Sequence, residues 1–409
     1  MSIPSIAPFS PELAQTHVEG APALPAEAAG IYVHVPFCAH ICPYCDFNTY
    51  SGQDALVPRY VAAVEQEIEA SAPLLIGRSV ASVFLGGGTP SLLSPDQIGR
   101  VLGACRSSFD LQRDAEVTLE VNPNGVDAAY FANLLETGVN RVSIGAQTLS
   151  RRGLRTLGRL HEAEQVGAAV QAARTAGVAN LSLDLLFGWP GQKPDAFGRD
   201  LDTVLASAVG GSLPEHLSLY SLIVEPGTPM ADAVARGVLV PPDDDAAADL
   251  YELAIDRLAN AGWAHYEVAN WSRESGLGSR HNRLYWRNGD YLGIGAGAHG
   301  HVGGRRWMNH LLPKTYCQAI ERGEDARSNV ETIPPPTAMG ETMMLGLRLL
   351  EDGVDAARFA ARHGISLDEA FGTAISDLVD LGLLRRSADT VALSRRGLML
   401  ANDVCARFL

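Results

Sequence analysis

Apolar and polar positions along the chain alternate regularly after residue 30 between short strand-like runs and longer helical stretches. Short apolar runs rich in β-branched residues predict strands, and apolar positions three or four apart predict helices. Six strand-like runs precede residue 224, at 31–37, 79–87, 115–123, 141–147, 179–188 and 216–223. A helical stretch separates each run from the next, so the pattern predicts six βα units.

Several of these runs, such as "LSLDLLFG" at 181–188, read as apolar on both faces. That pattern is typical of a parallel sheet covered by helices. Repeated βα units form either an open doubly wound sheet or a closed or partly closed barrel. Polar or glycine residues recur at the carboxyl ends of the strands, which favours the barrel. We therefore expect an α/β fold with a partial (β/α)6 barrel of the TIM type, whose strand ends meet at one mouth.

The pattern changes beyond residue 240, where a long helix is predicted over 244–262. A strand at "AHYEVANW" (264–271) follows, and then an aromatic and glycine-rich stretch at 281–300. The run Pro334, Pro335, Pro336 predicts a linker. After it, three amphipathic helical stretches (337–350, 367–384 and 395–409) and a hairpin at 386–394 indicate a small winged-helix-like domain.

The expected organisation has four parts. A disordered tail is predicted at 1–30, because this stretch holds five prolines and no lysine or arginine. A core barrel at 31–240 comes next, followed by an α/β extension at 241–333 that completes the core. The helical, winged-helix-like domain at 334–409 ends the chain.

Composition and charge limit the classes of function. The 409 residues are 46% hydrophobic and carry a formal net charge of −15, which argues against a nucleic-acid-binding surface. The first basic residue is Arg59, so the start resembles neither a secretory signal nor a transit peptide. No apolar run reaches the roughly 18 residues of a membrane span. A cytoplasmic location is expected.

Three of the six cysteines are crowded together, at Cys38, Cys42 and Cys45. Isolated Cys105, Cys317 and Cys405 are expected to be buried apolar residues, whereas a cluster without an export signal is more typical of a metal or redox site. Structural zinc needs four ligands, which a histidine such as His34 or His40 could complete. An iron–sulfur cluster held by three cysteines instead keeps one iron open. The spacing favours the second alternative and leaves the first open.

The motif "CAHICPYC", preceded by "IYVHVPF" and followed by "GGGTP" after the next strand, resembles the signature of radical S-adenosylmethionine enzymes. The resemblance is to the coproporphyrinogen-dehydrogenase-like branch of that superfamily. It extends from residue 31 to the end through "LEVNP", "RVSIGAQT", "LGRLH", "LDLLFGWPGQ", "HLSLYSLIVEPGTP", "HNRLYW" and "GDYLGIGAGAHG".

The resemblance implies two cofactors. Cys38, Cys42 and Cys45 would ligate three irons of a 4Fe-4S cluster, and S-adenosylmethionine would chelate the fourth. Residues that match the cofactor-binding positions are Tyr32, Tyr44, Gly87, Gly88, Thr89, Glu120, Gln147, Arg159 and Asp184. Glycine allows close backbone approach, and Arg159 could pair with a carboxylate. Taken singly, each of these residues also has an ordinary structural explanation.

Two groups of this branch must be separated. In the oxygen-independent coproporphyrinogen oxidases, which decarboxylate two propionates, a fourth cysteine stands two residues after the third. Here Phe47 occupies that position, as in the heme chaperone group. The resemblance therefore implies a chaperone that binds heme and delivers it to respiratory hemoproteins, with the oxidase as the alternative. Productive turnover of S-adenosylmethionine, self-association as a homodimer and transient association with membrane-bound acceptors stay open.

The motif "HNRLYW" resembles the one associated with heme binding in the chaperone group. The residues concerned are His281, Asn282, Tyr285 and Trp286. An imidazole can ligate heme iron, and aromatic rings can pack on a flat macrocycle. The alternative is that His281 caps a turn while the aromatic rings fill the seam between barrel and carboxyl-terminal domain.

Overall fold

The computed structural model describes residues 28–241 and 244–409, and a twelve-stranded mixed sheet forms its centre. The predicted tail lies mostly outside these residues. Its boundary is too late, because Ala29 and Gly30 already belong to the first strand, β1 (Ala29–Val35). Two short strands, β2 (Phe37–Cys38) and β3 (Tyr50–Ser51), pair with each other beside the sheet.

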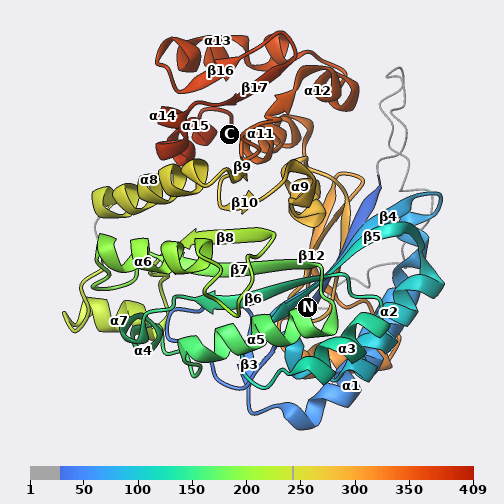
Figure 1. The fold of residues 1–409 in the computed structure, drawn as a ribbon. Coiled ribbons are helices and arrows are strands. Elements are labelled where there is room, and N and C mark those ends of the chain that lie inside the picture. The colour runs from blue at the N-terminus through green and yellow to red at the C-terminus, as the bar shows by residue number, and fades with distance from the viewer. Residues whose placement is uncertain (1–27, 242–243) are drawn as a thin grey trace.

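Six neighbouring strands of the large sheet are parallel, in the order of the sequence. They are β1, β4 (Ser79–Gly87), β5 (Asp110–Val121), β6 (Arg141–Gln147), β7 (Asn180–Phe187) and β8 (His216–Ser221). The direction of these strands turns from steep at β4 to nearly horizontal at β8, which is the curvature of a partial barrel (Figure 1). The expected (β/α)6 architecture is confirmed.

Helices connect these strands and cover the outer face of the curved sheet (Figure 1). The longer ones are α1 (Val57–Ser71), α2 (Pro95–Ser108), α3 (Ala128–Glu136), α5 (Ala163–Ala176) and α6 (Pro194–Leu205). Two shorter helices, α4 (Arg151–Thr156) and α7 (Pro229–Ala235), follow β6 and β8. Local signals fix the helix ends. For example, Ser94 and Gln97 form a reciprocal capping box at the start of α2.

The two faces of the parallel strands differ in polarity. In β7, Leu181, Leu183 and Leu185 belong to the hydrophobic core beneath the helices, whereas Ser182 and Asp184 form hydrogen bonds with neighbouring strands on the inner face. The expectation of two apolar faces for this strand is wrong. Each buried leucine on the outer face contributes roughly 1.5–3 kcal/mol to the fold, so the outer face holds the barrel together and the inner face is free for polar groups.

The segment after α8 (Asp244–Asn260) supplies strands to both edges of the parallel sheet. The predicted single strand at 264–271 is wrong. The chain turns back there and forms two strands, β9 (Ala264–Glu267) and β10 (Asn270–Ser272), and β10 pairs with β8. At the other edge, β11 (Tyr291–Ile294) lies parallel to β1. Antiparallel strands β12 (His299–Val302), β13 (Arg305–Asn309) and β14 (Arg327–Thr332) extend that edge.

The proline run does not form the predicted linker. Pro334 is the N-cap of α11 (Pro335–Gly346), and the next two prolines stand in its first turn. Proline is tolerated there because the amide groups of the first turn have no partner within the helix. The expected hairpin is present as β16 (Leu384–Arg386) and β17 (Thr390–Leu393).

The carboxyl-terminal domain has a separate hydrophobic core, to which Met343, Phe359 and Ile375 belong. This domain also contains β15 (Val354–Asp355) and α12 (Ala356–His363), which were not expected from the sequence. The predicted helical stretches correspond to α11, α13 (Leu367–Asp380), α14 (Arg395–Met399) and α15 (Ala401–Ala406). This domain lies above α8 and α9 (Arg280–Trp286) in Figure 1.

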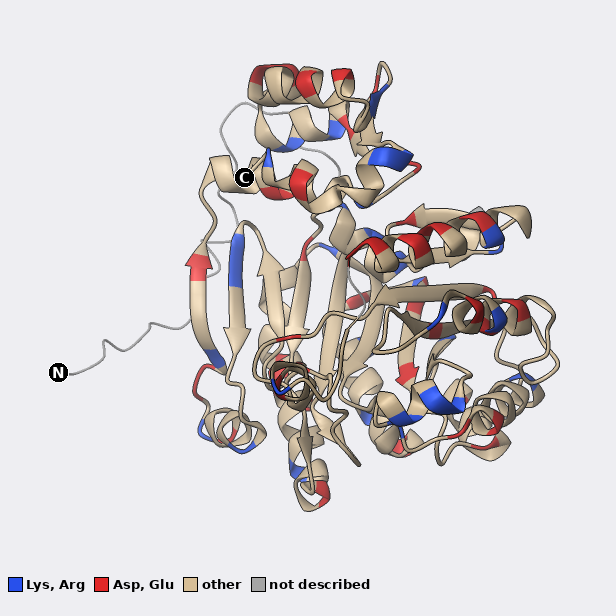
Figure 2. Ribbon diagram, turned by 90° about the vertical axis from the view of Figure 1, so that its left-hand side faces the viewer, with Lys and Arg blue, Asp and Glu red and all other residues tan. Residues whose placement is uncertain are grey.

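Charged residues lie mainly on helices and loops, while the strands of the large sheet are mostly uncharged (Figure 2). Within residues 28–241 and 244–409, no helix combines the length and hydrophobicity needed to cross a bilayer.

A buried carboxylate ties the extension to the barrel. Glu67 on α1 is 7% exposed and accepts hydrogen bonds from the Tyr316 hydroxyl on α10 (Pro313–Glu321), from Asn309 Nδ2 and from the Gly295 amide, at 2.6, 2.6 and 2.7 Å. Burial raises the pKa of Glu67 to about 7 despite these donors. The three donors come from three segments of the extension, so this side chain organises their packing.

We expect Glu67→Ala to lower the thermal midpoint by several degrees. Three donors would lose their acceptor, and each unsatisfied buried donor costs roughly 1–3 kcal/mol. Glu69→Ala, an exposed position on the same helix, is the matched control and should leave the midpoint within about one degree. Equal midpoints for the two variants in differential scanning calorimetry would contradict this role of Glu67.

Candidate functional site

The cysteine loop, residues 38–49, is held in place from three sides. Pairing of Phe37 with Tyr50 joins its two ends. Asn48 Nδ2 donates to the carbonyl oxygens of Ala296 and Leu311, at 3.1 and 2.9 Å. The Met230 amide at the start of α7 donates to Pro43 O at 2.9 Å. The loop therefore depends on the extension and on α7 as well as on β1.

The three thiols lie on this loop and are partly exposed. Partial burial raises the pKa of Cys38 and Cys45. Two other elements donate to the sulfur atoms: Thr89 Oγ1 lies 3.5 Å from Cys38 Sγ, and Arg159 Nη1 lies 3.6 Å from Cys42 Sγ. Such donors and a nearby cation favour the thiolate, which is the form that binds metal.

The glycine loop after β4 packs its backbone directly against the start of the cysteine loop. The amides of Gly88 and Thr89 donate to Val35 O and Phe37 O, both at 2.8 Å. A Cβ atom on Gly88 would lie 2.7 Å from Phe37 O and 3.1 Å from Cys38 Sγ. Gly87 has φ +113°, and a Cβ there would lie 2.4 Å from the His34 ring. Larger residues would push the first cysteine out of position.

Two carboxylates face the inside of the barrel beside this loop. Glu120 Oε2 accepts from the Gly87 amide at 3.0 Å, and Asp184 accepts from the Ser143 hydroxyl at 2.9 Å. Burial raises the pKa of Glu120 to about 8, and repulsion from Asp184 adds to this effect. The pKa of Asp184 is raised as well, again by burial. Such shifts are typical of functional sites.

Gln147 and Arg159 meet at the end of β6. A bulge follows Gly145, and Gln147 adopts φ +64°, a strained conformation for a non-glycine residue that costs roughly 1–3 kcal/mol. A Cβ on Gly145 would lie 2.8 Å from Gln147 Nε2, and the Gly145 carbonyl accepts from Arg159 Nη2 at 3.2 Å. The glycine therefore leaves room for the Gln147 side chain, while its carbonyl holds Arg159.

Tyr32 and Tyr44 have different neighbours at the site. The hydroxyl of Tyr32 on β1 is hydrogen-bonded to His34 Nδ1 at 2.9 Å, and its ring stacks on Phe84. Tyr44 lies among Cys42, Cys45 and Arg159, and burial raises its pKa. The structure thus places the three cysteines and most of the nine expected cofactor-binding residues at or beyond the carboxyl ends of the strands, as the barrel predicts, while Tyr32 and Asp184 stand within β1 and β7.

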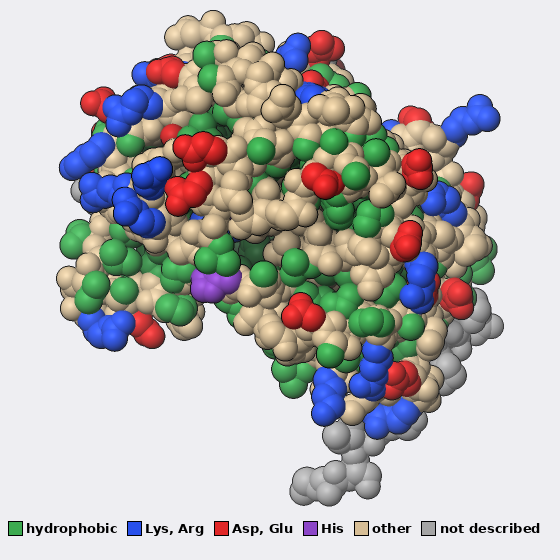
Figure 3. All heavy atoms as spheres, turned by 60° about the horizontal axis from the view of Figure 1, so that its bottom comes forward, with side chains coloured by type: hydrophobic (Ala, Val, Ile, Leu, Met, Phe, Trp, Pro, Cys, Tyr) green, Lys and Arg blue, Asp and Glu red, His purple; other side chains and the backbone are tan. Residues whose placement is uncertain are grey.

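Exposed apolar side chains surround this mouth. Phe47 on the cysteine loop, Leu160 after α4 and Ile223 after β8 are 65–67% exposed. Leu311 and Leu312 are also exposed, and the Leu311 carbonyl is bound by Asn48. β3, which follows the cysteine loop, lies at the bottom of Figure 1, and the view from that side shows hydrophobic side chains around a hollow (Figure 3).

The "HNRLYW" motif lies elsewhere, on α9, against the interior of the barrel and the carboxyl-terminal domain. His281 is 1% exposed, and both ring nitrogens have partners: Nδ1 lies 2.9 Å from the Ser82 hydroxyl, and Nε2 lies 2.8 Å from the Tyr285 hydroxyl. The backbone amide of Asn282 donates to the Ser279 hydroxyl, which caps α9. The Trp286 ring packs against the Arg348 guanidinium. A heme iron would have to displace one of the two partners of His281.

The zinc alternative is not supported by the described residues. His34 uses one ring nitrogen for Tyr32 and the other for Asn48 O, and His40 is exposed. Across residues 28–241 and 244–409, no three His, Cys, Asp or Glu side chains converge on one point where a single ion could bind. A four-iron cluster does not need such convergence, because each thiolate binds a different iron. The three-thiol donor set fits the cluster.

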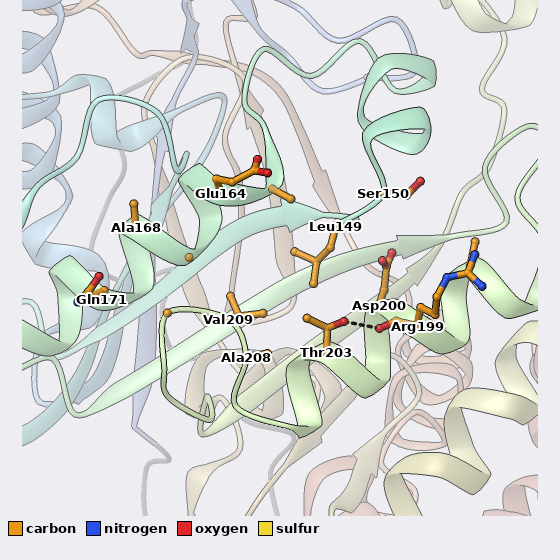
Figure 4. A pocket seen from close by; sticks show the side chains of 14 residues that line it. Leu149, Ser150, Glu164, Ala168, Gln171, Arg199, Asp200, Thr203, Ala208 and Val209 are labelled. Atoms are coloured by element: carbon orange, nitrogen blue, oxygen red, sulfur yellow. Dashed lines mark hydrogen bonds between the residues drawn. The ribbon is translucent and has the colours of Figure 1, made fainter.

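A groove of about 740 Å³ lies outside the barrel, between α5 and α6 (Figure 4). Small side chains such as Ala168 and Ala208 form much of its lining, and Asp200 is held by Thr148. None of the cysteines or expected cofactor-binding residues line it. We therefore place the candidate site at the mouth of the barrel.

Sequence reasoning missed three residues that support the site. Asn48 holds the cysteine loop, and Ser143 holds Asp184. Arg141, at the start of β6, is 2% exposed inside the barrel. Alternation along β6 could have placed Ser143 and Arg141 on one face, whereas the contacts of Asn48 span about 250 residues of sequence and leave no local signal.

Comparisons with known proteins agree with this geometry. The family model of the radical SAM superfamily matches residues 32–204, and that of the HemN C-terminal domain matches residues 333–400. The heme chaperone HemW of Bacillus subtilis is 37% identical over 380 residues, which cover 92% of this chain and 98% of that protein. HemW of Escherichia coli is 34% identical over 386 residues, which cover 93% of this chain and 97% of that protein.

One solved structure is similar over nearly the whole chain. It is the coproporphyrinogen III oxidase HemN from Escherichia coli, a radical SAM enzyme, with a TM-score of 0.78. The alignment covers 94% of this chain and 91% of that chain at 23% identity. At that identity the likeness supports the fold alone.

We expect Gly88→Ala to lose most of its iron. The added Cβ meets backbone oxygens, which cannot move aside as a flexible side chain can. Gly103→Ala on α2 is the matched control, since nothing lies within 4 Å of a Cβ there, and alanine favours a helix by up to about 1 kcal/mol. Iron and sulfide analysis after anaerobic purification tests this. Full iron content in Gly88→Ala would show that the loop tolerates the side chain.

The raised pKa of Glu120 predicts a pH-dependent stability of the ligand-free protein. The folded state binds a proton more tightly than the unfolded state, so this contribution to unfolding free energy falls between about pH 4.5 and pH 8. Glu120→Gln removes the titration. The stability of this variant relative to the parent should therefore increase between pH 6 and pH 9. The increase in relative unfolding free energy should be at least about 1.4 kcal/mol, seen as a rise of its thermal midpoint relative to that of the parent. Parallel curves for the two proteins would refute the assignment.

Proposed function

The chain belongs to the family of HemW heme chaperones within the radical SAM superfamily, and we propose from this membership that it binds heme and delivers it to hemoproteins. The observation that carries the proposal is the identity of 32–37% to curated heme chaperones of five bacterial species over more than nine-tenths of their length. The radical SAM scaffold at residues 32–204 supports the cofactors.

We propose that Cys38, Cys42 and Cys45 hold a 4Fe-4S cluster. The support is the three-thiol donor set on one anchored loop, with Phe47 exposed where a fourth cysteine could stand. Thr89 and Arg159 would continue to donate to the sulfur atoms and so favour the thiolates. Together with S-adenosylmethionine, such a cluster supplies one-electron chemistry when bound.

The residues around the mouth would bind and orient S-adenosylmethionine. The glycine loop of Gly87, Gly88 and Thr89 allows close approach. Asp184 and Glu120 offer carboxylates to hydroxyl or ammonium groups, and Arg159 offers a guanidinium to a carboxylate. Tyr32, Tyr44 and Gln147 complete the binding surface that we assign to this cofactor.

Heme contact is proposed at two places. The motif residues His281, Asn282, Tyr285 and Trp286 remain the site implied by resemblance, although His281 would first have to give up a hydrogen bond. The apolar rim formed by Phe47, Leu160 and Ile223 supports contact with a flat apolar macrocycle without any rearrangement. The rim lies beside the proposed cluster, whereas the motif lies on the far side of Phe84.

The acceptors that we propose are respiratory apo-hemoproteins, some of them membrane-bound. The protein would act from the cytoplasm and associate with the membrane transiently, and it could do so as a homodimer. Oxidation of coproporphyrinogen is the alternative function. Phe47 argues against it, because the oxidase pattern has cysteine at that position.

One anaerobic, cluster-loaded sample tests the two functions together. We expect heme to bind, followed by transfer to an apo-cytochrome, and no decarboxylation of coproporphyrinogen with reductant and S-adenosylmethionine. Heme binding is measured by absorbance titration, and decarboxylation by chromatography of the porphyrins. Decarboxylation without heme binding would replace the chaperone function with the oxidase.

Two variants separate the heme sites. Phe47→Ser should weaken heme binding about tenfold if the rim is used, because a buried phenyl group contributes roughly 1.5–3 kcal/mol. His281→Ala should abolish the spectrum of a histidine-ligated heme if the motif is used. Ile76→Ser, which changes an equally exposed apolar residue away from the mouth, is the control and should leave heme affinity unchanged.

A further inference from the structure

Arg141 is a buried arginine inside the barrel that none of the assignments above uses. In β6, Val142 and Ile144 point into the core beneath the helices, so Arg141 and Ser143 face the inside. Arg141 stands in register with Thr118 on β5 and Asn180 on β7. Glu120 lies two residues beyond Thr118 on β5, and Asp184 lies four residues beyond Asn180 on β7. Both carboxylates are therefore nearer to the mouth than Arg141.

The guanidinium is not consumed by a local ion pair. Among the residues that the structure describes, the Nε–H group of Arg141 has no hydrogen-bond partner, and neither do Thr118 Oγ1 and Asn180 Oδ1. A buried charge without a counter-charge is strongly unfavourable. Its compensation must therefore come from charges a little further away in the same enclosed space.

Those charges are the two carboxylates at the mouth. Arg141 lowers the pKa of both Glu120 and Asp184, against burial, which raises them, and against the repulsion that Asp184 exerts on Glu120. Two carboxylates that repel each other in a low-dielectric site resist ionising together unless a cation is present. Arg141 is the cation that both of them share.

The phenols and imidazoles around this pair stay neutral, while two further buried carboxylates have hydrogen-bond donors of their own. Burial raises the pKa of Tyr32 and Tyr285, and it lowers the pKa of His34, His216 and His281, the last to about 3. Glu116 is bound by Ser279, Arg280 and His281 at the start of α9, and Glu267 by Asn270. When all three are ionised, Arg141, Glu120 and Asp184 carry one positive and two negative charges.

We propose that Arg141 is a positioning residue that keeps the Glu120–Asp184 pair ready to receive a cationic cofactor at neutral pH. With both carboxylates ionised, the three side chains carry a net charge of −1. S-adenosylmethionine carries a net charge of +1 at neutral pH, from one sulfonium, one ammonium and one carboxylate group. This inference rests on the proposed cofactor. It adds that cofactor binding releases the proton that Glu120 holds in the ligand-free protein.

Binding of S-adenosylmethionine to anaerobic, cluster-loaded protein between pH 6.5 and pH 9.5 tests the proposal by isothermal titration calorimetry. In the parent protein, affinity should rise with pH and level off near pH 8, with proton uptake by the buffer. In Arg141→Met the pH at which the affinity reaches its plateau should rise by about one unit or more, because the carboxylates lose their cation. Arg141→Lys should restore the parent profile.

Controls separate this role from a structural one. Arg113→Gln, an exposed position on β5, should leave the profile unchanged, and iron content should be equal in all variants. The amino group of the cofactor titrates identically in every experiment, so differences between profiles report the protein. An Arg141→Met profile that is weaker by the same factor at every pH would overturn the proposal in favour of a structural role.

If Arg141→Met fails to fold, Arg141→Gln takes its place in the titrations. Proton release by the parent protein on binding S-adenosylmethionine then serves as a second test. Binding by the parent without proton release at pH 7 would overturn the inference and leave the proposed function intact. A parent protein that binds no S-adenosylmethionine would instead refute the proposed cofactor.

Discussion

The alternation of buried apolar and inward-facing polar residues along the parallel strands is the constraint on which the rest of the structure depends. Every second residue, such as Leu183 or Ile144, is buried under the helices, so the intervening residues must face an enclosed interior. That interior contains carboxylates, hydroxyls, imidazoles and one arginine, all of which require partners inside the protein. Helix α9 closes one end of this space through His281 and leaves the mouth open beside the cysteines. The site therefore follows from the need to satisfy a polar core.

The parallel part of the fold could be predicted because its signals are local. Each strand is a short apolar run, and each helix has its own periodicity, so six βα units were expected and are present. The predictions that were wrong concern segments whose structure depends on tertiary contacts. The turn between β9 and β10 has no glycine or proline to mark it. The proline run reads as a linker by composition, yet proline is also favoured in the first turn of a helix, and only the contacts of α11 distinguish the two.

Resemblance predicted which residues meet at the mouth, because the motifs lie on strands and loops that any barrel brings together. What sequence could not provide is the state of those residues. His281 looked like an available ligand, but packing against Ser82 and Tyr285 encloses it. Arg141 looked like an ordinary residue at the start of a strand, and only its burial beside two carboxylates distinguishes it. Burial and charge balance arise from many elements at once, so no single motif records them.

The segment 264–309 covers both edges of the parallel sheet, with β10 beside β8 and β11 beside β1. Because the ribosome makes the chain from its amino terminus, all six parallel strands emerge before either edge can be covered. The edge at β8 stays uncovered until β10 is made, about fifty residues later, and the edge at β1 until β11 is made, about seventy residues after β8. Until then these edges present unpaired amide and carbonyl groups to the crowded cell. The nascent barrel is thus most vulnerable to misassociation when it is already complete in strand number. Chaperones that shield open sheet edges would act in that interval.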